Sequence, residues 1–368
     1  MQIYKAINRG MMNVDKVIGF LKTYNGPQIK LMEVCGTHTS AIAKSGIRSV
    51  ISPGIKLISG PGCPVCVTPA SYIDKCVEYS LKEGHVLMTF GDMMKVPGAI
   101  ESLSAARGRG ARAELMYSPF EVIEKAQKNT DTTYVLAAVG FETTAPAYAL
   151  LLKEAKEKGV SNIKIISAIK TIIPALSWIC ENEKEIDGFI CPGHVSVIIG
   201  IEGYKKLYEK YGKPFVITGF EPEHILAGIY DLTIMTSGEK NPQARNLYKS
   251  AVKDGGNEKA RSAIAECFKE GNAMWRGIGM IENSGLYLNE QYSEYDAGSF
   301  GLDEDKKLSG GCRCGDVIVG RINPDECPMF GKTCSPANPF GPCMVSEEGT
   351  CGIWFRHRQV VFENSAAD

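Results

Sequence analysis

The stretch TTYVLAAVGFETTAPAYALLLKEAKEKG, residues 132–159, decides the fold class. It opens with a run of apolar and β-branched residues, turns at Gly140 and continues with apolar residues at helical spacing, the pattern of a buried strand followed by a helix. Strand-and-turn patterns recur in IKLMEVCGTHTSAIAKSGI (29–47), HVLMTFGD (85–92), IKIISAIKT (163–171), DGFICPGHVSVIIG (187–200) and PFVITGFEPEHILAGIYDL (214–232). This alternation predicts an α/β protein with parallel sheets covered by helices.

The chain has 368 residues, which is too long for one ordinary core. We predict two Rossmann-like α/β domains with parallel sheets, at residues 29–118 and 119–235, and a helical, Cys-rich iron–sulfur domain at residues 236–368. Residues 1–28 are expected to form an N-terminal helix that packs on the C-terminal domain. Two pairs of similar motifs, LISGPGCPVCV with GFICPGHVSVI and VLMTFGDMM with LAAVGFETT, favour two related halves with a site in the crevice between them.

The composition favours a cytoplasmic protein that binds neither nucleic acid nor membranes. The formal net charge is −1, so no overall electrostatic field attracts nucleic acid or an anionic membrane. The sequence shows no secretory signal and no run of about 18 uninterrupted apolar residues. Thirteen cysteines in a reducing compartment indicate metal or redox chemistry more than a disulfide framework.

The strongest metal-binding pattern lies near the carboxyl end, where six cysteines fall within forty residues: Cys312, Cys314, Cys327, Cys334, Cys343 and Cys351. A set of four thiolates, separated by fourteen, six and sixteen residues, comes from Cys312, Cys327, Cys334 and Cys351. Long loops with a proline directly after Cys327 favour an iron–sulfur cluster over zinc, which usually has two close Cys-x-x-Cys knuckles. Zinc and unliganded thiols remain alternatives, Cys314 could replace Cys312, and Cys343 is a second spare.

The turn GPGCPVC, residues 60–66, places two thiols where a strand-like run ends. A helix-compatible segment follows, so the first thiol is expected near backbone N–H groups and the positive end of a helix dipole, which favour thiolate. We therefore predict that Cys63 and Cys66 cycle between dithiol and disulfide or handle a metal. The alternative is half of a zinc site, but the sequence has no second Cys-x-x-Cys pair.

Two further strand ends carry a cysteine and a histidine. In EVCGTHT, residues 33–39, Cys35 is a candidate nucleophile or soft-metal ligand, and His38 follows three residues later. In ICPGHVS, residues 190–196, Cys191 and His194 flank a turn of the kind that faces ligands in α/β domains. The alternatives are that both cysteines are packing residues at strand ends and that His38 is a hydrogen-bonded turn residue.

The remaining cysteines and two other turn residues have plainer interpretations. Cys76, Cys180 and Cys267 lie at apolar positions of helix-like segments and are predicted to be core thiols. Glu142 in GFETT and His224 in GFEPEH are predicted either to cap a helix or to line the crevice.

Taken in order, these motifs resemble those of the HypD family of [NiFe]-hydrogenase maturation proteins, along nearly the whole chain. The resemblance rests on CGTHT (35–39), GPGCPVC (60–66), GFETT (140–144), CPGHVS (191–196) and the spaced carboxy-terminal cysteines. It implies two α/β domains plus a domain that carries a [4Fe-4S] cluster. It also implies a redox-active scaffold, rather than a conventional enzyme, on which the Fe(CN)2(CO) unit of the hydrogenase is built.

By match to the family motifs, Cys35 is the expected ligand of the iron that is being assembled, with His38 orienting or protonating beside it. Cys63 and Cys66 are the expected redox-active pair, and Cys191 and His194 are further candidate metal ligands. The expected cluster ligands are Cys312, Cys327, Cys334 and Cys351. The implied partners are HypC, which shares the iron through an amino-terminal cysteine, and HypE, which supplies cyanide from a carbamoyl group delivered by HypF.

Two other functions stay open on the residues alone. One is an iron–sulfur oxidoreductase acting on a thiol or a small metabolite, although no strand is followed by a G-x-G-x-x-G dinucleotide fingerprint. The other is a zinc-stapled interaction module with inert core cysteines.

Overall fold

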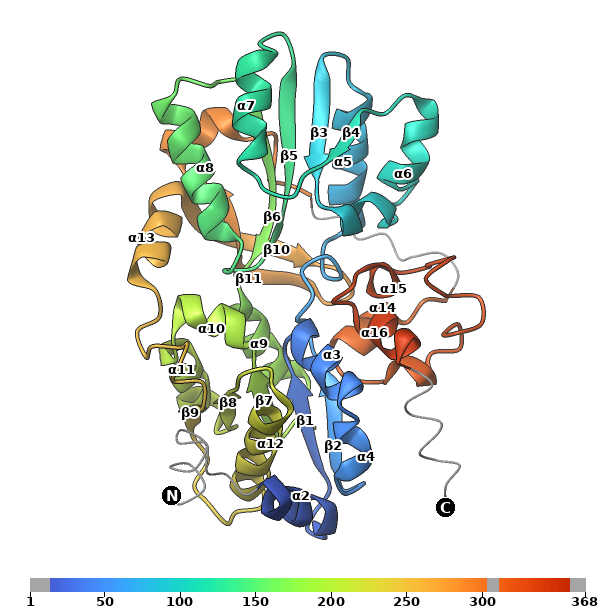
Figure 1. Ribbon diagram of the computed structural model, residues 1–368, viewed down its shortest axis with the longest axis vertical. Helices are drawn as coiled ribbons and strands as arrows, with labels where there is room; N and C mark the ends of the chain where they lie inside the picture. The colour runs from blue at the N-terminus through green and yellow to red at the C-terminus, as the bar shows by residue number, and fades with distance from the viewer. Residues whose placement is uncertain (1–13, 303–310, 358–368) are drawn as a thin grey trace.

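The computed structural model describes residues 14–302 and 311–357, and their strands form two sheets (Figure 1). Sheet A has the order β2-β1-β7-β8-β9, and all its neighbouring strands are parallel. Its strands are β1 (Ile29–Glu33), β2 (Ile55–Ser59), β7 (Gly188–Cys191), β8 (Phe215–Ile217) and β9 (Ala244–Asn246). Sheet B has the order β10-β11-β6-β5-β3-β4. Its strands are β3 (His85–Thr89), β4 (Ala113–Leu115), β5 (Thr133–Gly140), β6 (Ile163–Lys170), β10 (Phe268–Trp275) and β11 (Gly279–Leu288).

The two sheets differ in strand direction. The strands β3 to β6 of sheet B are parallel, whereas β11 runs antiparallel to both β6 and β10. The central strands β5 and β6 are buried along almost their whole length, as expected for parallel strands with both faces covered. The predicted α/β class is therefore confirmed, and sheet B differs from the expectation only in its antiparallel hairpin.

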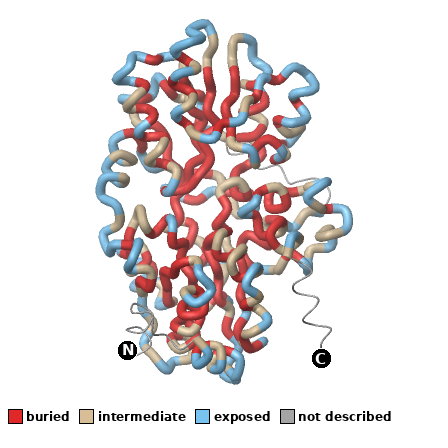
Figure 2. The backbone as a smooth tube through the Cα atoms, in the orientation of Figure 1, coloured by how far each residue is buried: buried red, intermediate tan, exposed pale blue. Residues whose placement is uncertain are grey.

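Each sheet is covered by helices and forms a lobe with its own buried core (Figure 2). The sheet A lobe contains α2 (Val14–Thr23), α3 (Gly36–Lys44), α4 (Ile47–Val50), α9 (Ile172–Asn182), α10 (Gly193–Ile199), α11 (Glu202–Tyr211) and α12 (Pro222–Thr236). The sheet B lobe contains α5 (Ala70–Leu81), η1 (Gly91–Lys95), α6 (Leu103–Ala106), η2 (Arg107–Arg109), α7 (Glu121–Lys128), α8 (Ala145–Glu157), α13 (Glu258–Cys267) and η3 (Glu290–Tyr295).

A third unit, here called the Cys-rich unit, comprises residues 311–357. Its short helices are α14 (Cys314–Ile318), η4 (Pro324–Glu326), α15 (Pro342–Val345) and α16 (Thr350–Arg356). The unit lies at the side of the molecule, where α16 contacts α3 of the sheet A lobe (Figure 1). Few of its residues have regular apolar spacing, so its packing depends on the body of the protein.

The lobes do not follow the predicted domain boundaries. Residues 29–118 supply β1 and β2 to sheet A but β3 and β4 to sheet B, and residues 119–235 are divided in the same way between the two sheets. The predicted boundary at residue 118 is therefore wrong, and so is the assignment of residues 236–302 to the Cys-rich domain, because β9, β10 and β11 complete the two sheets. The alternation pattern shows that a strand exists but not which strands it pairs with.

Two smaller expectations are also corrected. The helix near the amino end, α2, packs with Val17 and Leu21 in the core of the sheet A lobe, against α12 and α4, and not on the Cys-rich unit; the rest of the predicted helix, residues 1–13, lies outside the described residues. The similar motifs do not mark two halves, since β2 and β7 flank β1 in sheet A while β3 and β5 are neighbours in sheet B.

In the parts of the chain that the structure describes, no helix has the length and apolar character needed to cross a membrane.

Candidate metal centre and thiol site

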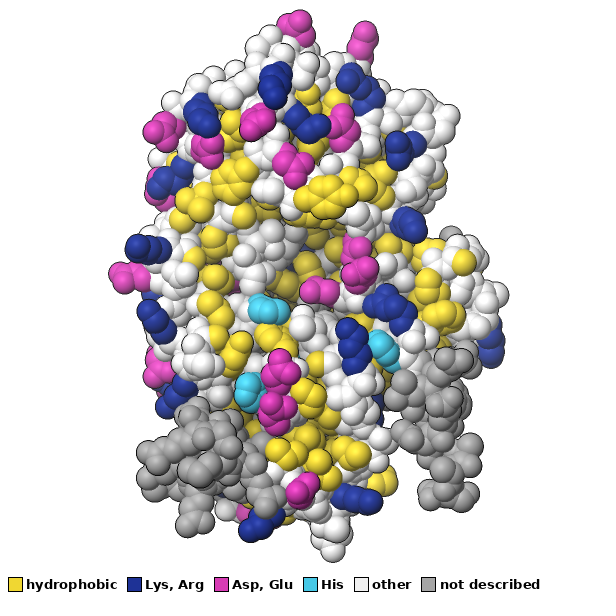
Figure 3. Space-filling view, in the orientation of Figure 1, with side chains coloured by type: hydrophobic (Ala, Val, Ile, Leu, Met, Phe, Trp, Pro, Cys, Tyr) yellow, Lys and Arg dark blue, Asp and Glu magenta, His cyan; other side chains and the backbone are white. Residues whose placement is uncertain are grey.

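The motif residues converge because sheet A is parallel. Its strands β2, β1 and β7 lie side by side, so their carboxyl ends meet at one edge. The Cys63 turn follows β2, Cys35 follows β1, and Cys191 ends β7. This edge faces the waist between the two lobes, where Figure 3 shows a recess with histidine side chains at its margin. The motif residues therefore lie at the edge of sheet A that faces the other lobe, although the two lobes are interleaved in sequence.

Cys35 occupies the N-cap position of α3 and is almost completely buried, with 9% of its surface exposed. Burial raises the pKa of its thiol, while contacts with the backbone of His38 and with Thr37 act in the opposite direction. Gly62 lies against the Cys35 backbone, and Gly36 lies against the carbonyl oxygen of Glu348 in the Cys-rich unit. The thiol therefore sits where sheet A, the GPGCPVC turn and the Cys-rich unit meet.

Cys63 and Cys66 are joined as a disulfide, with a Cα–Cα distance of 5.3 Å. Both residues are buried, and the backbone N–H of Cys66 donates to Cys63 Sγ at 3.2 Å. The following helix, α5, begins only at Ala70, so the first thiol is not at a helix N-terminus as the sequence suggested. The turn itself, and not a helix dipole, supplies the local N–H donor.

His38 is completely buried at the start of α3. Its Nε2 lies 3.1 Å from the carbonyl oxygen of Gly219 and 3.0 Å from Thr218 Oγ1. Burial lowers the pKa of His38 to about 4, so the ring is neutral near neutral pH. The face of the ring packs on Phe220, with ring centroids 4.7 Å apart.

The two residues of the second Cys–His pair, Cys191 and His194, differ in burial. Cys191 is completely buried, and burial raises the pKa of its thiol. His194 is exposed and stacks on Phe220 with ring centroids 4.2 Å apart, on the ring that also packs against His38. Cys191 thus lies in the core, whereas His194 lies at the surface.

Glu142 comes from the end of β5 in the other lobe and is 5% exposed. Its Oε1 accepts a hydrogen bond of 2.8 Å from the backbone N–H of Ile172, the first residue of α9, so the predicted capping role is confirmed. Burial raises the pKa of Glu142 to about 7, although this hydrogen bond acts against the shift. A carboxylate of the sheet B lobe therefore caps a helix of the sheet A lobe.

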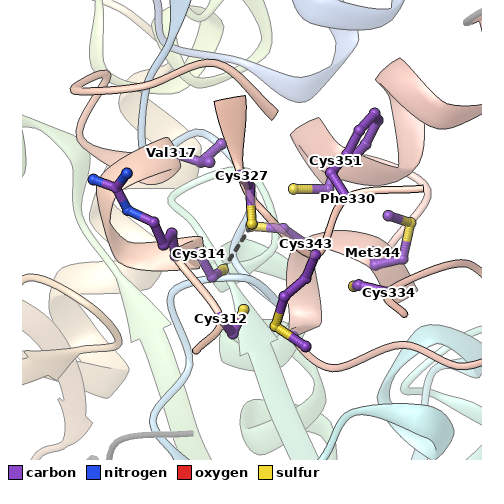
Figure 4. A pocket seen from close by; sticks show the side chains of 12 residues that line it. Cys312, Cys314, Val317, Cys327, Phe330, Cys334, Cys343, Met344 and Cys351 are labelled. Atoms are coloured by element: carbon purple, nitrogen blue, oxygen red, sulfur yellow. Dashed lines mark hydrogen bonds between the residues drawn. The ribbon is translucent and has the colours of Figure 1, made fainter. Parts of the chain in front are cut away.

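All six carboxy-terminal cysteines line one cavity with about 330 Å³ of empty volume, together with Met329, Phe330 and Met344 (Figure 4). Cys314 and Cys343, the two spare cysteines, lie with their Sγ atoms 3.0 Å apart and are nearly completely buried. Hydrogen bonds with the Cys312 and Cys343 thiols lower the pKa of Cys314.

Within residues 14–302 and 311–357, no group of three or more His, Cys, Asp or Glu side chains is arranged to hold a single metal ion. Thiols spread around a cavity suit a polynuclear centre, in which each thiolate binds a different iron, better than zinc held tetrahedrally at one point.

The thiol groups are connected by one continuous apolar core. Cys63, Cys66, Cys314 and Cys343 belong to the same buried cluster, and Trp275 packs in it as well. The backbone N–H of Arg276 donates to the carbonyl of Val67 at 2.8 Å, which ties the β10–β11 hairpin to the end of the disulfide turn. Buried residues therefore lead from the disulfide to the cavity of the Cys-rich unit without crossing solvent.

Sequence reasoning missed Thr218 and Phe220, which contact the ring of His38. The sequence VITGFEPEH predicts a strand followed by a turn at these residues. Only the sheet order, in which β7 lies between β1 and β8, shows that the ends of β1 and β8 lie near each other. Cys76, Cys180 and Cys267 are buried core thiols, as predicted.

Comparison with known proteins gives the family. A family model described as "HypD: Hydrogenase formation hypA family" matches residues 13–358. The chain belongs to the HypD family. It is 39% identical over 335 residues to the hydrogenase maturation factor HypD of Escherichia coli, covering 90% of each chain. It is 38% identical over 347 residues to the HypD of Azotobacter vinelandii, covering 91% of each, and 37% identical over 337 residues to that of Rhodobacter capsulatus, covering 89% of each. The resemblance seen in the motifs is thereby confirmed, and the chain is a hydrogenase maturation factor.

Proposed function

We propose that this maturation factor is the cytoplasmic scaffold on which the Fe(CN)2(CO) unit of a [NiFe]-hydrogenase is assembled. The observation that carries the proposal is a series of contacts between three sulfur groups. The disulfide turn lies against Cys35, and the disulfide shares a buried cluster with two cysteines of the cavity in the Cys-rich unit. Iron that carries cyanide and carbonyl is a soft centre, and thiolates are its natural protein ligands.

In this proposal Cys35 is the ligand through which the chain holds the iron cargo. Its buried position shields the iron from water, and its thiol, with a raised pKa, gives up its proton when the metal binds. His38, whose backbone contacts the Cys35 thiol, has a neutral ring that orients or exchanges a proton with the cargo. The exposed His194 is a further candidate contact, whereas the burial of Cys191 favours a packing role.

The Cys-rich unit is proposed to bind a [4Fe-4S] cluster through Cys312, Cys327, Cys334 and Cys351. These thiols and the two spare ones surround a cavity with apolar neighbours, a donor set that suits such a cluster. When bound, the cluster supplies one electron at a time. Reduction of the Cys63–Cys66 disulfide takes two electrons and two protons, so a second donor or two successive deliveries are required.

The proposed partners follow from the family resemblance. A small protein of the HypC type is expected to share the iron through its amino-terminal cysteine, and HypE is expected to supply cyanide made from the carbamoyl group that HypF provides. The recess between the lobes offers such partners an open surface on the molecule (Figure 3).

The experiment is infrared spectroscopy and metal analysis of the chain purified without oxygen together with its partners. We expect cyanide and carbonyl bands, acid-labile sulfide, and four iron atoms per chain in addition to the cargo iron. Cys35→Ala is expected to keep the four iron atoms and lose the bands.

Cys76→Ala is the matched control, because Cys76 is also a buried thiol but lies in the core of the other lobe. It should keep both the bands and the iron. Bands that survive in Cys35→Ala would reject the role of Cys35, and turnover of a small thiol substrate without partners would favour an oxidoreductase instead.

A further inference from the structure

The two ring nitrogens of His38 have different surroundings. Nε2 lies within hydrogen-bonding distance of the Gly219 carbonyl oxygen and of Thr218 Oγ1. Nδ1 is buried and has no hydrogen-bond partner among the residues that the structure describes. A carbonyl oxygen can only accept, so the nitrogen beside Gly219 must carry the proton. A second proton, on Nδ1, would be buried with its charge and without an acceptor, so Nδ1 is left with its lone pair.

The ring is also fixed in space. Phe220 packs on the ring of His38, and His194 stacks on the same Phe220. The position of Thr218 is set by Gly228 of α12, since a Cβ atom on Gly228 would come within 2.3 Å of Thr218 Cγ2. The hydroxyl group and the carbonyl that meet Nε2 belong to consecutive residues directly after β8, so one short segment holds the Nε2 side of the imidazole.

We propose that Thr218 and Gly219 hold His38 as the Nε2–H tautomer, so that Nδ1 is the atom with which His38 acts, as a hydrogen-bond acceptor for a donor group delivered with the cargo. Thr218 is thereby a positioning residue that nothing in the motifs assigns. The role of Nδ1 during assembly rests on the proposed function, which it deepens. The tautomer itself is a property of the free protein. An unpaired buried acceptor is costly to a fold, and a site that receives a partner group during assembly accounts for its presence.

The tautomer is measured by ¹⁵N–¹H correlation spectra of the full chain labelled at histidine. The chain has five histidines, and the His38 signals are assigned by their loss in His38→Gln. We expect a protonated Nε2 and an unprotonated Nδ1 in the free protein. A proton on Nδ1 would overturn the proposal, whatever the cargo turns out to be.

The consequence is tested with paired variants and the yield of cyanide and carbonyl bands. Thr218→Val keeps the volume and removes one acceptor from Nε2, so the yield should fall about three- to tenfold, the equivalent of one hydrogen bond. Thr218→Ser should recover most of the yield. Thr233→Val is the control, because Thr233 is as buried as Thr218 but donates to the Ile229 carbonyl within α12.

Two substitutions of His38 separate its nitrogens. An asparagine amide lies near the position of Nδ1, whereas a glutamine amide reaches the position of Nε2. His38→Asn should retain more of the yield than His38→Gln, and the reverse order would overturn the assignment of Nδ1. If the parent protein itself shows no bands, the proposed function fails, while the spectra still decide the tautomer.

Discussion

Gly62 lies so close to Cys35 that a Cβ atom on Gly62 would come within 2.6 Å of both the N and the Cα atom of Cys35. The backbone of Gly62 does not have a positive φ, so the glycine is needed for space and not for conformation. The turn that carries Cys63 can therefore cross over the start of α3 only because one residue lacks a side chain. This contact holds the disulfide turn beside the proposed iron ligand.

Gly62→Ala should push the disulfide turn away from Cys35. Overpacking of this kind costs about 1–3 kcal/mol, and the neighbouring atoms here are backbone atoms that cannot rotate aside. We expect the free energy of unfolding to fall by that amount and the cyanide and carbonyl bands to weaken strongly. Gly91→Ala is the control, because a Cβ atom there meets nothing within 4 Å and the backbone φ is not positive. Equal behaviour of the two variants would show that the close approach is unimportant.

The proposed ligand set can be tested against the two spare cysteines. Cys314 and Cys343 contact each other inside the cavity, so replacing both by serine removes a thiol pair and leaves the four proposed ligands. We expect the double variant to retain four iron atoms and acid-labile sulfide. Cys327→Ser should lose most of both, because it removes one of the four ligands. Loss of iron in the double variant would mean that Cys314 or Cys343 is itself a cluster ligand.

Glu142 should make stability depend on pH in an unusual direction. Burial raises its pKa from 4.5 to about 7, so between these values the folded state binds more protons than the unfolded state. Stability from this group is therefore fully present below about pH 4.5 and is lost as the pH rises through about 7. Glu142→Gln keeps the acceptor for the Ile172 N–H and removes the charge, so its stability relative to the parent should grow by up to about 3 kcal/mol between pH 5 and pH 8.

The measurement is denaturant unfolding of both proteins across that pH range. His38, whose pKa is lowered to about 4, contributes the opposite slope, with stability that is lost as the pH falls from about 6.5 toward 4. This contribution is present in both proteins and cancels in their difference. A difference that does not change with pH would mean that Glu142 titrates normally.

The convergence of the cysteine motifs was predictable, and the sheet order was not. Strand patterns in 29–47 and 187–200 predict turns at the carboxyl ends of parallel strands, which is where Cys35 and Cys191 lie. The pairing of Leu31 with Gly188 cannot be read from local propensity, because it joins segments that are far apart in the chain. The error in the domain boundaries has the same origin.

The contacts of individual side chains could not be predicted from the sequence either. The residue types at Thr218 and Gly219 carry no sign that they meet His38, and Gly62 looks like one of many turn glycines. These contacts depend on the path of loops after the strands, which no periodicity encodes. The spacing of the carboxy-terminal cysteines predicts four ligands and two further thiols. Only the fold shows that these two, Cys314 and Cys343, contact each other.

Arg48 links the strand that leads to Cys35 with the Cys-rich unit. Its guanidinium pairs with the Glu33 carboxylate at 2.7 Å, donates to the carbonyl of Leu57 and lies over the ring of Trp354 at 5.0 Å. Glu33 is completely buried in β1, and burial raises the pKa of its carboxyl group even though Arg48 acts against the shift. The cation is therefore the main group that makes a charge at Glu33 tolerable.

Arg48→Met should lower the free energy of unfolding by about 3–5 kcal/mol, because it leaves a buried carboxylate without its cation. Adding Glu33→Gln should restore most of that loss, since the second change removes the stranded charge. Arg321→Met is the control, as its pair with Glu183 involves a half-exposed arginine and should be worth no more than about 1 kcal/mol. Denaturant unfolding of the single, double and control variants measures all three. If the double variant is as unstable as Arg48→Met alone, then the contacts of Arg48 with Leu57 and Trp354, and not the buried charge, hold the Cys-rich unit against β1.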